Sequence, residues 1–169
     1  MSADSPLLQL PNVYRAFYGG FTQLTAIQAA SLQPILSGQD VILQAATGTG
    51  KTEAVLAPCL ERLLQSQPRF SLIYIVPTRA LATDLKRRLQ PIAARLELTL
   101  GLRTGDHKHG GQFPDVLLTT PESLDVMLGS RNPALQQFLA RLAIVVIDEV
   151  HTLLHQYRGQ QLAYCLQRL

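Results

Sequence analysis

Residues 41–52 read Val-Ile-Leu-Gln-Ala-Ala-Thr-Gly-Thr-Gly-Lys-Thr, and this stretch decides how the rest of the chain is interpreted. The short apolar run Val41–Gln44 predicts a strand, and the periodic apolar residues of Glu53–Leu64 predict a helix. A glycine-rich turn between a strand and a helix is the setting of a phosphate-binding loop, because its backbone amides and the helix dipole face an anion. In such a loop Lys51 contacts the β- and γ-phosphates and Thr52 places its hydroxyl on Mg²⁺. The structural alternative is a glycine-rich turn followed by a surface lysine.

A second pattern lies near the end of the chain, where the apolar run Ala143–Ile147 predicts a buried strand that ends in Asp148 and Glu149. In a nucleotide hydrolase the first carboxylate holds Mg²⁺ and the second orients the attacking water. The alternative is a helix N-terminus whose acids interact with the helix dipole. Several strand–helix units separate the acids from Lys51, which is usual for two parts of one nucleotide site and favours the first interpretation.

Between these patterns, apolar strands alternate with periodic helical segments. The predicted strands are Val41–Gln44, Leu72–Val76, Leu98–Leu102, Val116–Thr119 and Ala143–Ile147, and the predicted helices are Val13–Phe17, Ala26–Leu36, Glu53–Leu64, Arg79–Leu96, Pro121–Leu128, Asn132–Leu139 and Gln160–Leu169. We expect Pro91 to interrupt its helix. Continuous apolar strands alternating with helices predict an α/β fold, with a mostly parallel sheet covered on both faces and ligands at the carboxyl ends of its strands.

Composition narrows the class of protein. The 169 residues are enough for one domain, and 47% apolar with 16% charged residues excludes a disordered chain. The longest apolar run, Leu142–Ile147, is too short to cross a bilayer, so we expect no membrane partner and a cytoplasmic or nucleoid-associated location. Cys59 and Cys165 are expected to be buried thiols. The net charge of +3 permits a polyanionic partner without requiring one.

Taken together, the motifs resemble the first RecA-like motor domain of superfamily 2 helicases. Residues 148–151, Asp-Glu-Val-His, look like motif II of the DExH type, and Ala45 stands where motif I of these helicases has Ala in place of Gly. Phe21 and residues 24–28, Leu-Thr-Ala-Ile-Gln, resemble a Q motif. The resemblance implies a three-layer P-loop NTPase fold that uses ATP and Mg²⁺. The nucleotide-binding residues that it implies are Phe21, Gln28, Ala46, Thr47, Gly48, Thr49, Gly50, Lys51 and Thr52, the catalytic residues are Lys51, Asp148, Glu149 and His151, and the Mg²⁺ ligands are Thr52 and Asp148.

Two further segments resemble the motifs with which these helicases grip the phosphates of one strand. Residues 77–82 look like motif Ia and residues 119–124 look like motif Ib. The nucleic-acid contacts that follow are Thr78, Arg79, Arg103, Thr120 and Ser123. A helix cap at residues 119–123 is the structural alternative. Residues 103–106, 114–124 and 158–159 resemble the corresponding segments of the large helicase-related (Lhr) family.

The resemblance covers residues 21–169, the N-terminal RecA-like ATP-binding domain, and residues 1–20 precede it as an N-terminal segment. No sequence like motif III follows His151, and no second RecA-like domain with its arginine fingers is present. In this fold the motif III strand lies between the phosphate-loop strand and the Asp148 strand, so we expect a domain that is incomplete at its C-terminal side and lacks a central strand.

The function expected from the resemblance is that of a motor-domain fragment of an ATP-dependent helicase or translocase. It would bind ATP·Mg²⁺ and part of the backbone track of single-stranded or partly duplex DNA or RNA, and it would work with a second RecA-like domain. A truncated nucleotide- or nucleic-acid-binding module without turnover is the alternative. A P-loop kinase does not account for the segments like motifs Ia and Ib.

Overall fold

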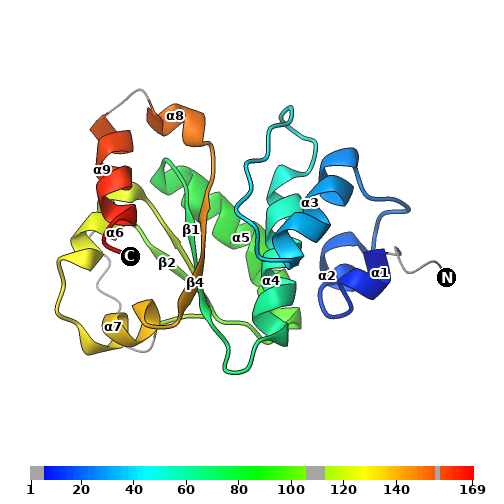
Figure 1. Ribbon diagram of the computed structural model, residues 1–169, viewed down its shortest axis with the longest axis horizontal. Helices are drawn as coiled ribbons and strands as arrows, with labels where there is room; N and C mark the ends of the chain where they lie inside the picture. The colour runs from blue at the N-terminus through cyan, green and yellow to red at the C-terminus, as the bar shows by residue number, and fades with distance from the viewer. Residues whose placement is uncertain (1–5, 106–112, 155–156) are drawn as a thin grey trace. The chain divides into compact units, whose positions relative to one another are not determined.

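The computed structural model describes residues 6–105, 113–154 and 157–169. The chain forms two compact units, Met1–Arg69 and Phe70–Leu169 (Figure 1).

The first unit is helical. Its helices are α1 (Pro6–Gln9), α2 (Tyr14–Tyr18), α3 (Ala26–Leu36) and α4 (Lys51–Gln65). Helix α3 begins where the sequence predicts, because the Thr25 hydroxyl accepts from the backbone amide of Gln28 while the Gln28 side chain accepts from the amide of Thr25. Helices α3 and α4 pack together, and α4 buries residues such as Leu56, Leu60 and Leu63. The predicted helices of this unit are confirmed, and α1 was not expected.

Pro58 lies inside α4 without ending it. A proline has no amide hydrogen, so the carbonyl of Ala54, four residues earlier, loses its helical donor. The buried Ser31 hydroxyl of α3 lies 2.8 Å from that carbonyl oxygen and 3.0 Å from the carbonyl of Gln28. A side chain of the neighbouring helix therefore satisfies the backbone group that Pro58 leaves open.

A buried carboxylate attaches the N-terminal segment to α4. Glu61 is fully buried and accepts from the backbone amides of Asn12, at 3.0 Å, and Val13, at 3.1 Å. The Asn12 side-chain amide donates to Glu61 at 2.5 Å, and the Gln65 side-chain amide donates to Glu61 at 2.7 Å. These donors compensate the removal of a charge from water, which is otherwise costly.

The strand predicted over Val41–Gln44 is wrong, because residues 40–46 form neither helix nor strand. Val41 is 42% exposed and Ile42 is 91% exposed. An apolar run becomes a strand only when a neighbour completes its backbone ladder, and no described residue pairs with this segment in a sheet.

The second unit contains a four-stranded sheet and its covering helices. The strands are β1 (Ser71–Ile75), β2 (Leu100–Arg103), β3 (Val116–Thr119) and β4 (Leu142–Ile147), and the helices are α5 (Arg79–Arg95), α6 (Pro121–Leu128), α7 (Pro133–Leu139), α8 (Val150–Leu154) and α9 (Tyr157–Leu166). The strand order is β2-β3-β1-β4 and every pair is parallel. The predicted parallel sheet is therefore confirmed. Strand β1 pairs on both sides, whereas no described strand pairs with the outer edge of β4.

Alternation along β1 divides its side chains between the two faces of the sheet. Ile73 and Ile75 join a buried cluster with apolar residues of α6, α7 and α9, among them Leu124, Phe138 and Leu162. Helix α5 packs against β2 and β3, and Figure 1 shows it on the opposite side of the sheet from α6, α7 and α9. The sheet is thus covered on both faces, as predicted from its continuous apolar strands.

Two helix predictions for this unit need correction. Helix α5 runs without interruption through Pro91, which lies on an exposed position where water can hydrogen-bond the carbonyl of Arg87. The last helix begins at Tyr157 rather than Gln160, and α8 was not expected. The other boundaries agree with the predictions to within about two residues.

Both cysteines are free and buried, as expected. Burial raises the pKa of the Cys59 thiol to about 12, which makes this thiol unreactive at neutral pH. In the described part of the chain, no helix is both long and apolar enough to span a membrane.

The pairing of Ser31 with the carbonyl left open by Pro58 predicts a coupled pair of substitutions. We expect Ser31→Ala to lower the free energy of unfolding by about 1–2 kcal/mol, because the buried Ala54 carbonyl loses its donor. In a Pro58→Ala background, the alanine amide replaces that donor and the cost of Ser31→Ala should fall by about 1 kcal/mol.

Urea unfolding of the four proteins of this cycle measures the coupling. Ser37→Ala is the matched control, because its hydroxyl also bonds a carbonyl of α3 but is exposed, and its effect should stay within about 0.5 kcal/mol. Equal costs of Ser31→Ala in both backgrounds would contradict the assignment.

Candidate functional site

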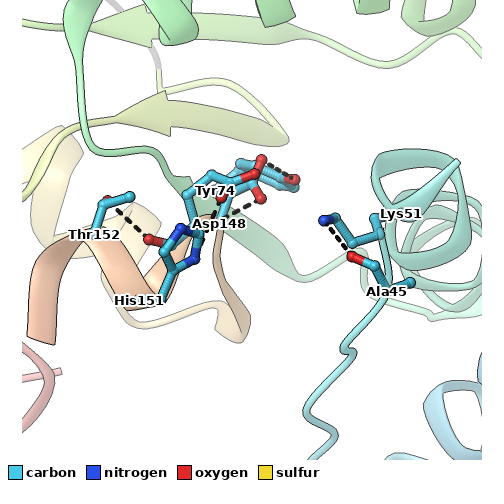
Figure 2. Close-up of polar contacts among 7 residues, drawn as sticks. Ala45, Lys51, Tyr74, Asp148, His151 and Thr152 are labelled. Carbon is cyan, nitrogen blue, oxygen red and sulfur yellow. Dashed lines mark hydrogen bonds and ion pairs between the residues drawn. The ribbon is translucent and has the colours of Figure 1, made fainter. Parts of the chain in front are cut away.

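The phosphate loop of the first unit has the backbone that its glycines predict. Gly48 has φ 81° and Gly50 has φ 83°, in the left-handed region that favours glycine, and α4 begins directly after Gly50. The Thr49 hydroxyl donates to the carbonyl of Ala46 at 2.8 Å. The Lys51 ammonium group donates to the carbonyl of Ala45, also at 2.8 Å, so this charge lies over the loop (Figure 2).

Side chains at the start of α3 hydrogen-bond the backbone of the loop. The Thr25 hydroxyl donates to the carbonyl of Thr49 at 2.9 Å, and the Gln28 side-chain amide lies 3.5 Å from the carbonyl of Gly50. Gln28 is only 8% exposed, and its oxygen accepts from the Thr25 amide at 2.9 Å. One amide hydrogen and one lone pair of Gln28 therefore stay available for a ligand. Phe21 is 68% exposed, and its stacking role stays a prediction.

In the second unit, Asp148 follows β4 directly, as predicted. Its Oδ1 accepts from the backbone amide of Glu149 at 2.9 Å, and its Oδ2 accepts from the hydroxyl of Tyr74 at 3.0 Å (Figure 2). Sequence reasoning missed Tyr74. The signal was a hydroxyl-bearing aromatic residue within an otherwise apolar strand, since a buried hydroxyl requires a partner.

Glu149 has φ 49°, an unusual conformation for a residue with a side chain. Such a conformation costs on the order of 1–2 kcal/mol and occurs often at functional turns. The carbonyl of Glu149 accepts from the amide and the hydroxyl of Thr152, both at 2.8 Å, and its carboxylate lies 3.4 Å from Nδ1 of His151. This turn brings together Asp148, Glu149 and His151, which the sequence singled out.

A polar cluster lies at the carboxyl ends of β2 and β3. The Thr120 hydroxyl bonds the Ser123 hydroxyl at 3.2 Å, and the amide of Gly105 donates to the same Ser123 oxygen at 2.9 Å. A Cβ atom on Gly105 would lie 2.5 Å from the guanidinium of Arg79, so the Arg79 side chain passes directly over this turn. The Thr78 hydroxyl accepts from the amide of Leu81 and caps α5.

Arg103 departs from this group. Its carbonyl accepts from the Thr119 hydroxyl at 2.8 Å, but its guanidinium lies 3.9 Å above the ring centroid of Phe113. Burial lowers the pKa of this guanidinium below its usual value. Arg103 and Phe113 line an open cavity of about 490 Å³ beside β2, and the contact of Arg103 with a nucleic-acid strand stays a prediction. Asp106 lies outside the described residues.

Each unit, taken by itself, offers oxygen donors of the kind that Mg²⁺ prefers. This ion prefers hard oxygen ligands and commonly binds through one or two protein oxygens together with phosphates and water. Thr52 offers a hydroxyl, and each carboxylate oxygen of Asp148 keeps a lone pair beyond the single bond described for it. Over residues 6–105, 113–154 and 157–169, no group of three His, Cys, Asp or Glu side chains forms a separate metal centre.

The motif pattern matches a known family over most of the chain. A family model described as DEAD/DEAH box helicase matches residues 25–169. The chain belongs to this helicase family. The Lhr helicase/uracil glycosylase of Escherichia coli strain K12 is 33% identical over 197 residues, which cover 97% of this chain and 13% of that protein. The ATP-dependent helicase Lhr-Core of Sulfolobus acidocaldarius is 31% identical over 186 residues, which cover 97% of this chain and 21% of that protein.

Solved helicase structures share the fold. The DUF1998 helicase MrfA superimposes with a TM-score of 0.78 and 23% identity, over 94% of this chain and 26% of that chain. The same helicase bound to DNA and AMPPNP gives a TM-score of 0.69 and 22% identity, over 90% of this chain and 22% of that chain. These likenesses confirm the predicted RecA-like fold. This helicase domain corresponds to a small part of each of these longer proteins.

Within the second unit of this helicase domain, α9 is attached to α6 by polar side chains. Arg158 forms an ion pair with Glu122 at 2.5 Å, and Asp125 accepts from Gln161 at 2.9 Å and from Arg168 at 3.1 Å. Glu122 lies in the first turn of α6, beside Ser123. Arg158, one of the residues that resemble the Lhr family, thus contacts α6, the helix on which Ser123 of the polar cluster lies.

The two left-handed glycines of the phosphate loop predict substitutions with different costs. Alanine at Gly48 has open space around its new Cβ atom, so we expect a cost of about 1–2 kcal/mol from the backbone conformation alone. At Gly50, the new Cβ atom would also collide with the side-chain amide of Gln28. We therefore expect Gly50→Ala to lower the free energy of unfolding by more than Gly48→Ala does.

Urea unfolding of Gly48→Ala, Gly50→Ala and the double variant Gly50→Ala with Gln28→Ala checks this. Relative to Gln28→Ala alone, the double variant should lose only as much as Gly48→Ala loses. If Gly50→Ala costs no more than Gly48→Ala while Gln28 is intact, the close packing of Gln28 on the loop is wrong.

Proposed function

We propose that this helicase-family domain binds ATP with Mg²⁺ and forms the N-terminal motor half of a nucleic-acid helicase or translocase. The observation that carries the proposal is the loop of residues 45–51, in which two left-handed glycines precede a lysine at the start of a long helix. This backbone turns amide groups toward an anion, and the helix dipole adds to the attraction. Membership of the DEAD/DEAH box family supports the same reading.

The proposed roles follow from the chemistry of each group. Lys51 leaves the Ala45 carbonyl to contact the β- and γ-phosphates, and Thr52 and Asp148 hold Mg²⁺. When bound, the ion would supply positive charge that offsets the negative charge on the phosphate oxygens. Glu149 orients the attacking water and accepts its proton, and His151, which lies beside the Glu149 carboxylate, relays the nucleotide state to neighbouring elements.

A nucleic-acid strand is proposed to contact the polar cluster at the ends of β2 and β3. Hydroxyls, backbone amides and guanidinium groups bind phosphates without reading bases, so DNA and RNA are both candidates. Arg79, Thr120 and Ser123 supply such groups within one cluster. MrfA, which shares the fold, has been solved bound to DNA. Thr78 can contribute its remaining hydroxyl hydrogen, whereas Arg103 would first have to leave the Phe113 ring.

The rest of the motor is proposed to come from a second RecA-like domain. The relatives above are several times longer than the part that this chain matches. An arginine supplied from outside a P-loop site typically raises the rate of phosphoryl transfer by about 10³–10⁵. We therefore expect the 169-residue chain to turn over ATP more slowly than about 1 s⁻¹.

Nucleotide binding gives the direct test of the proposed ATP site. Lys51→Ala is expected to remove most of the affinity for a fluorescent ATP analogue in the presence of Mg²⁺, because the loop loses its charge beside the phosphates. Lys86→Ala, which removes the same charge from α5, is the matched control and should bind as the parent does. Superimposable titrations of the parent and Lys51→Ala would refute the phosphate-loop assignment.

Salt dependence tests the proposed strand contact. Arg79→Ala should weaken binding of single-stranded DNA and RNA to a similar degree, and should reduce the slope of log K against log salt by about 1. Arg95→Ala is the matched control, because Arg95 lies in the last turn of the same helix whereas Arg79 is its first residue. Loss of binding to only one base sequence, or equal effects of both variants, would contradict a backbone contact at Arg79. If longer forms of the protein bind a nucleic-acid strand but do not hydrolyse ATP measurably, the alternative of a binding module without turnover is favoured.

A further inference from the structure

The Asp148 carboxylate is fixed by two donors from different elements. One is the backbone amide of the next residue, Glu149, at 2.9 Å from Oδ1. The other is the hydroxyl of Tyr74 in β1, at 3.0 Å from Oδ2 (Figure 2). Because each carboxylate oxygen has one donor, the plane of the group and the direction of its remaining lone pairs are set before any ligand arrives.

The register of the sheet explains how Tyr74 reaches Asp148. Tyr74 is directly opposite Val146 in the pairing of β1 with β4. Side chains of a strand alternate between faces, so Val146 and Asp148 point to the same face, which is also the face of Tyr74. The tyrosine ring extends past Val146, and its hydroxyl meets the first polar residue after the strand.

The chemistry of this pair goes beyond packing. Tyr74 is 2% exposed, and the apolar neighbours in its strand, Ile73 and Ile75, are almost completely buried. A phenylalanine would fill nearly the same volume, yet it would leave Oδ2 of Asp148 without this donor. Donors of this kind orient the ligands of a metal, and their removal typically weakens metal binding or activity by about 10–100-fold.

We propose that Tyr74 is a positioning residue for Mg²⁺, acting through Asp148. This inference rests on the proposed role of Asp148 as a ligand of the ion. Tyr74 itself does not touch the ion. It holds the Asp148 carboxylate in one orientation, so that this group would not have to be reoriented in order to bind the ion.

The test is the dependence of nucleotide binding on free Mg²⁺ in the full chain, measured with the fluorescent ATP analogue and so independent of turnover. We expect Tyr74→Phe to bind the analogue as the parent does in EDTA. The free Mg²⁺ needed for half of the metal-dependent gain in affinity should rise by on the order of tenfold. Asp148→Asn should abolish that gain.

Tyr18→Phe is the matched control. Tyr18 is also buried, and its hydroxyl donates to the carbonyl of Glu53 at 2.9 Å rather than to a carboxylate. Both Tyr→Phe variants should lower the melting temperature to a similar extent, but the control should keep the Mg²⁺ dependence of the parent. A purely structural role of Tyr74 would move only the melting temperature.

The outcomes separate this inference from the proposed function. If Asp148→Asn loses the gain while Tyr74→Phe matches the parent, Tyr74 has no positioning role and the ATP site stands. If neither Mg²⁺ nor Asp148→Asn affects binding by the parent, the assignment of Asp148 fails, and the inference fails with it.

If the Tyr74→Phe variant does not fold, a second measurement, made on the parent protein, tests the proposal. The chain has five tyrosines, and replacement of the other four in turn assigns the ¹³Cζ resonance of Tyr74 in the labelled parent. We expect this resonance to shift when Mg²⁺ joins the nucleotide, because the hydrogen-bond acceptor of the hydroxyl then binds a cation. A resonance that is the same with and without Mg²⁺ would overturn the proposal.

Discussion

The backbone ladder of β1 is the constraint on which the second unit depends. This strand is buried along its whole length and is hydrogen-bonded to β3 on one side and to β4 on the other. The ladder continues beyond the strand ends, since the amide of Val76 donates to the carbonyl of Thr119 and the amide of Asp148 donates to the carbonyl of Ile75. The proposed strand-binding turn after β3 and the acidic turn after β4 are therefore set at the same level by one strand. Any shift of β1 along its axis would move both turns.

In the first unit, a helix rather than a strand positions the proposed binding loop. Thr25, Gln28 and Ser31 are spaced three residues apart, so they lie along one face of α3. Their side chains approach the carbonyls of Thr49, Gly50 and Ala54, respectively, along the join between the phosphate loop and α4. The loop glycines supply an unusual backbone, and this polar face of α3 supports it. A change in the position of α3 would thus displace the backbone of the phosphate loop.

The sequence predicted those features that depend on neighbouring residues. The helix over Ala26–Leu36 agrees with its prediction to the residue, and the capping box that begins it is a local feature of the sequence, as is Pro121 at the start of α6. The strand over Val41–Gln44 was wrong because a ladder requires a partner that the sequence does not identify. The bond between Tyr74 and Asp148 depends on the register of two strands that are far apart in the sequence. Arg103 stays a predicted contact of the nucleic-acid track, and the position of its guanidinium over the ring of Phe113 is a tertiary contact that the sequence pattern does not reveal.

The outer edge of β4 has a consequence for the handling of this protein. Its amide and carbonyl groups have no described strand to pair with, and its side chains Val145, Val146 and Ile147 are partly exposed. An apolar edge of this kind is a template for cross-molecular pairing and amyloid-like assembly. During synthesis in a cell, the edge can pair with other molecules until a further strand covers it, whether that strand comes from this chain or from another. The yield of soluble protein should therefore depend on how soon after β4 that cover becomes available.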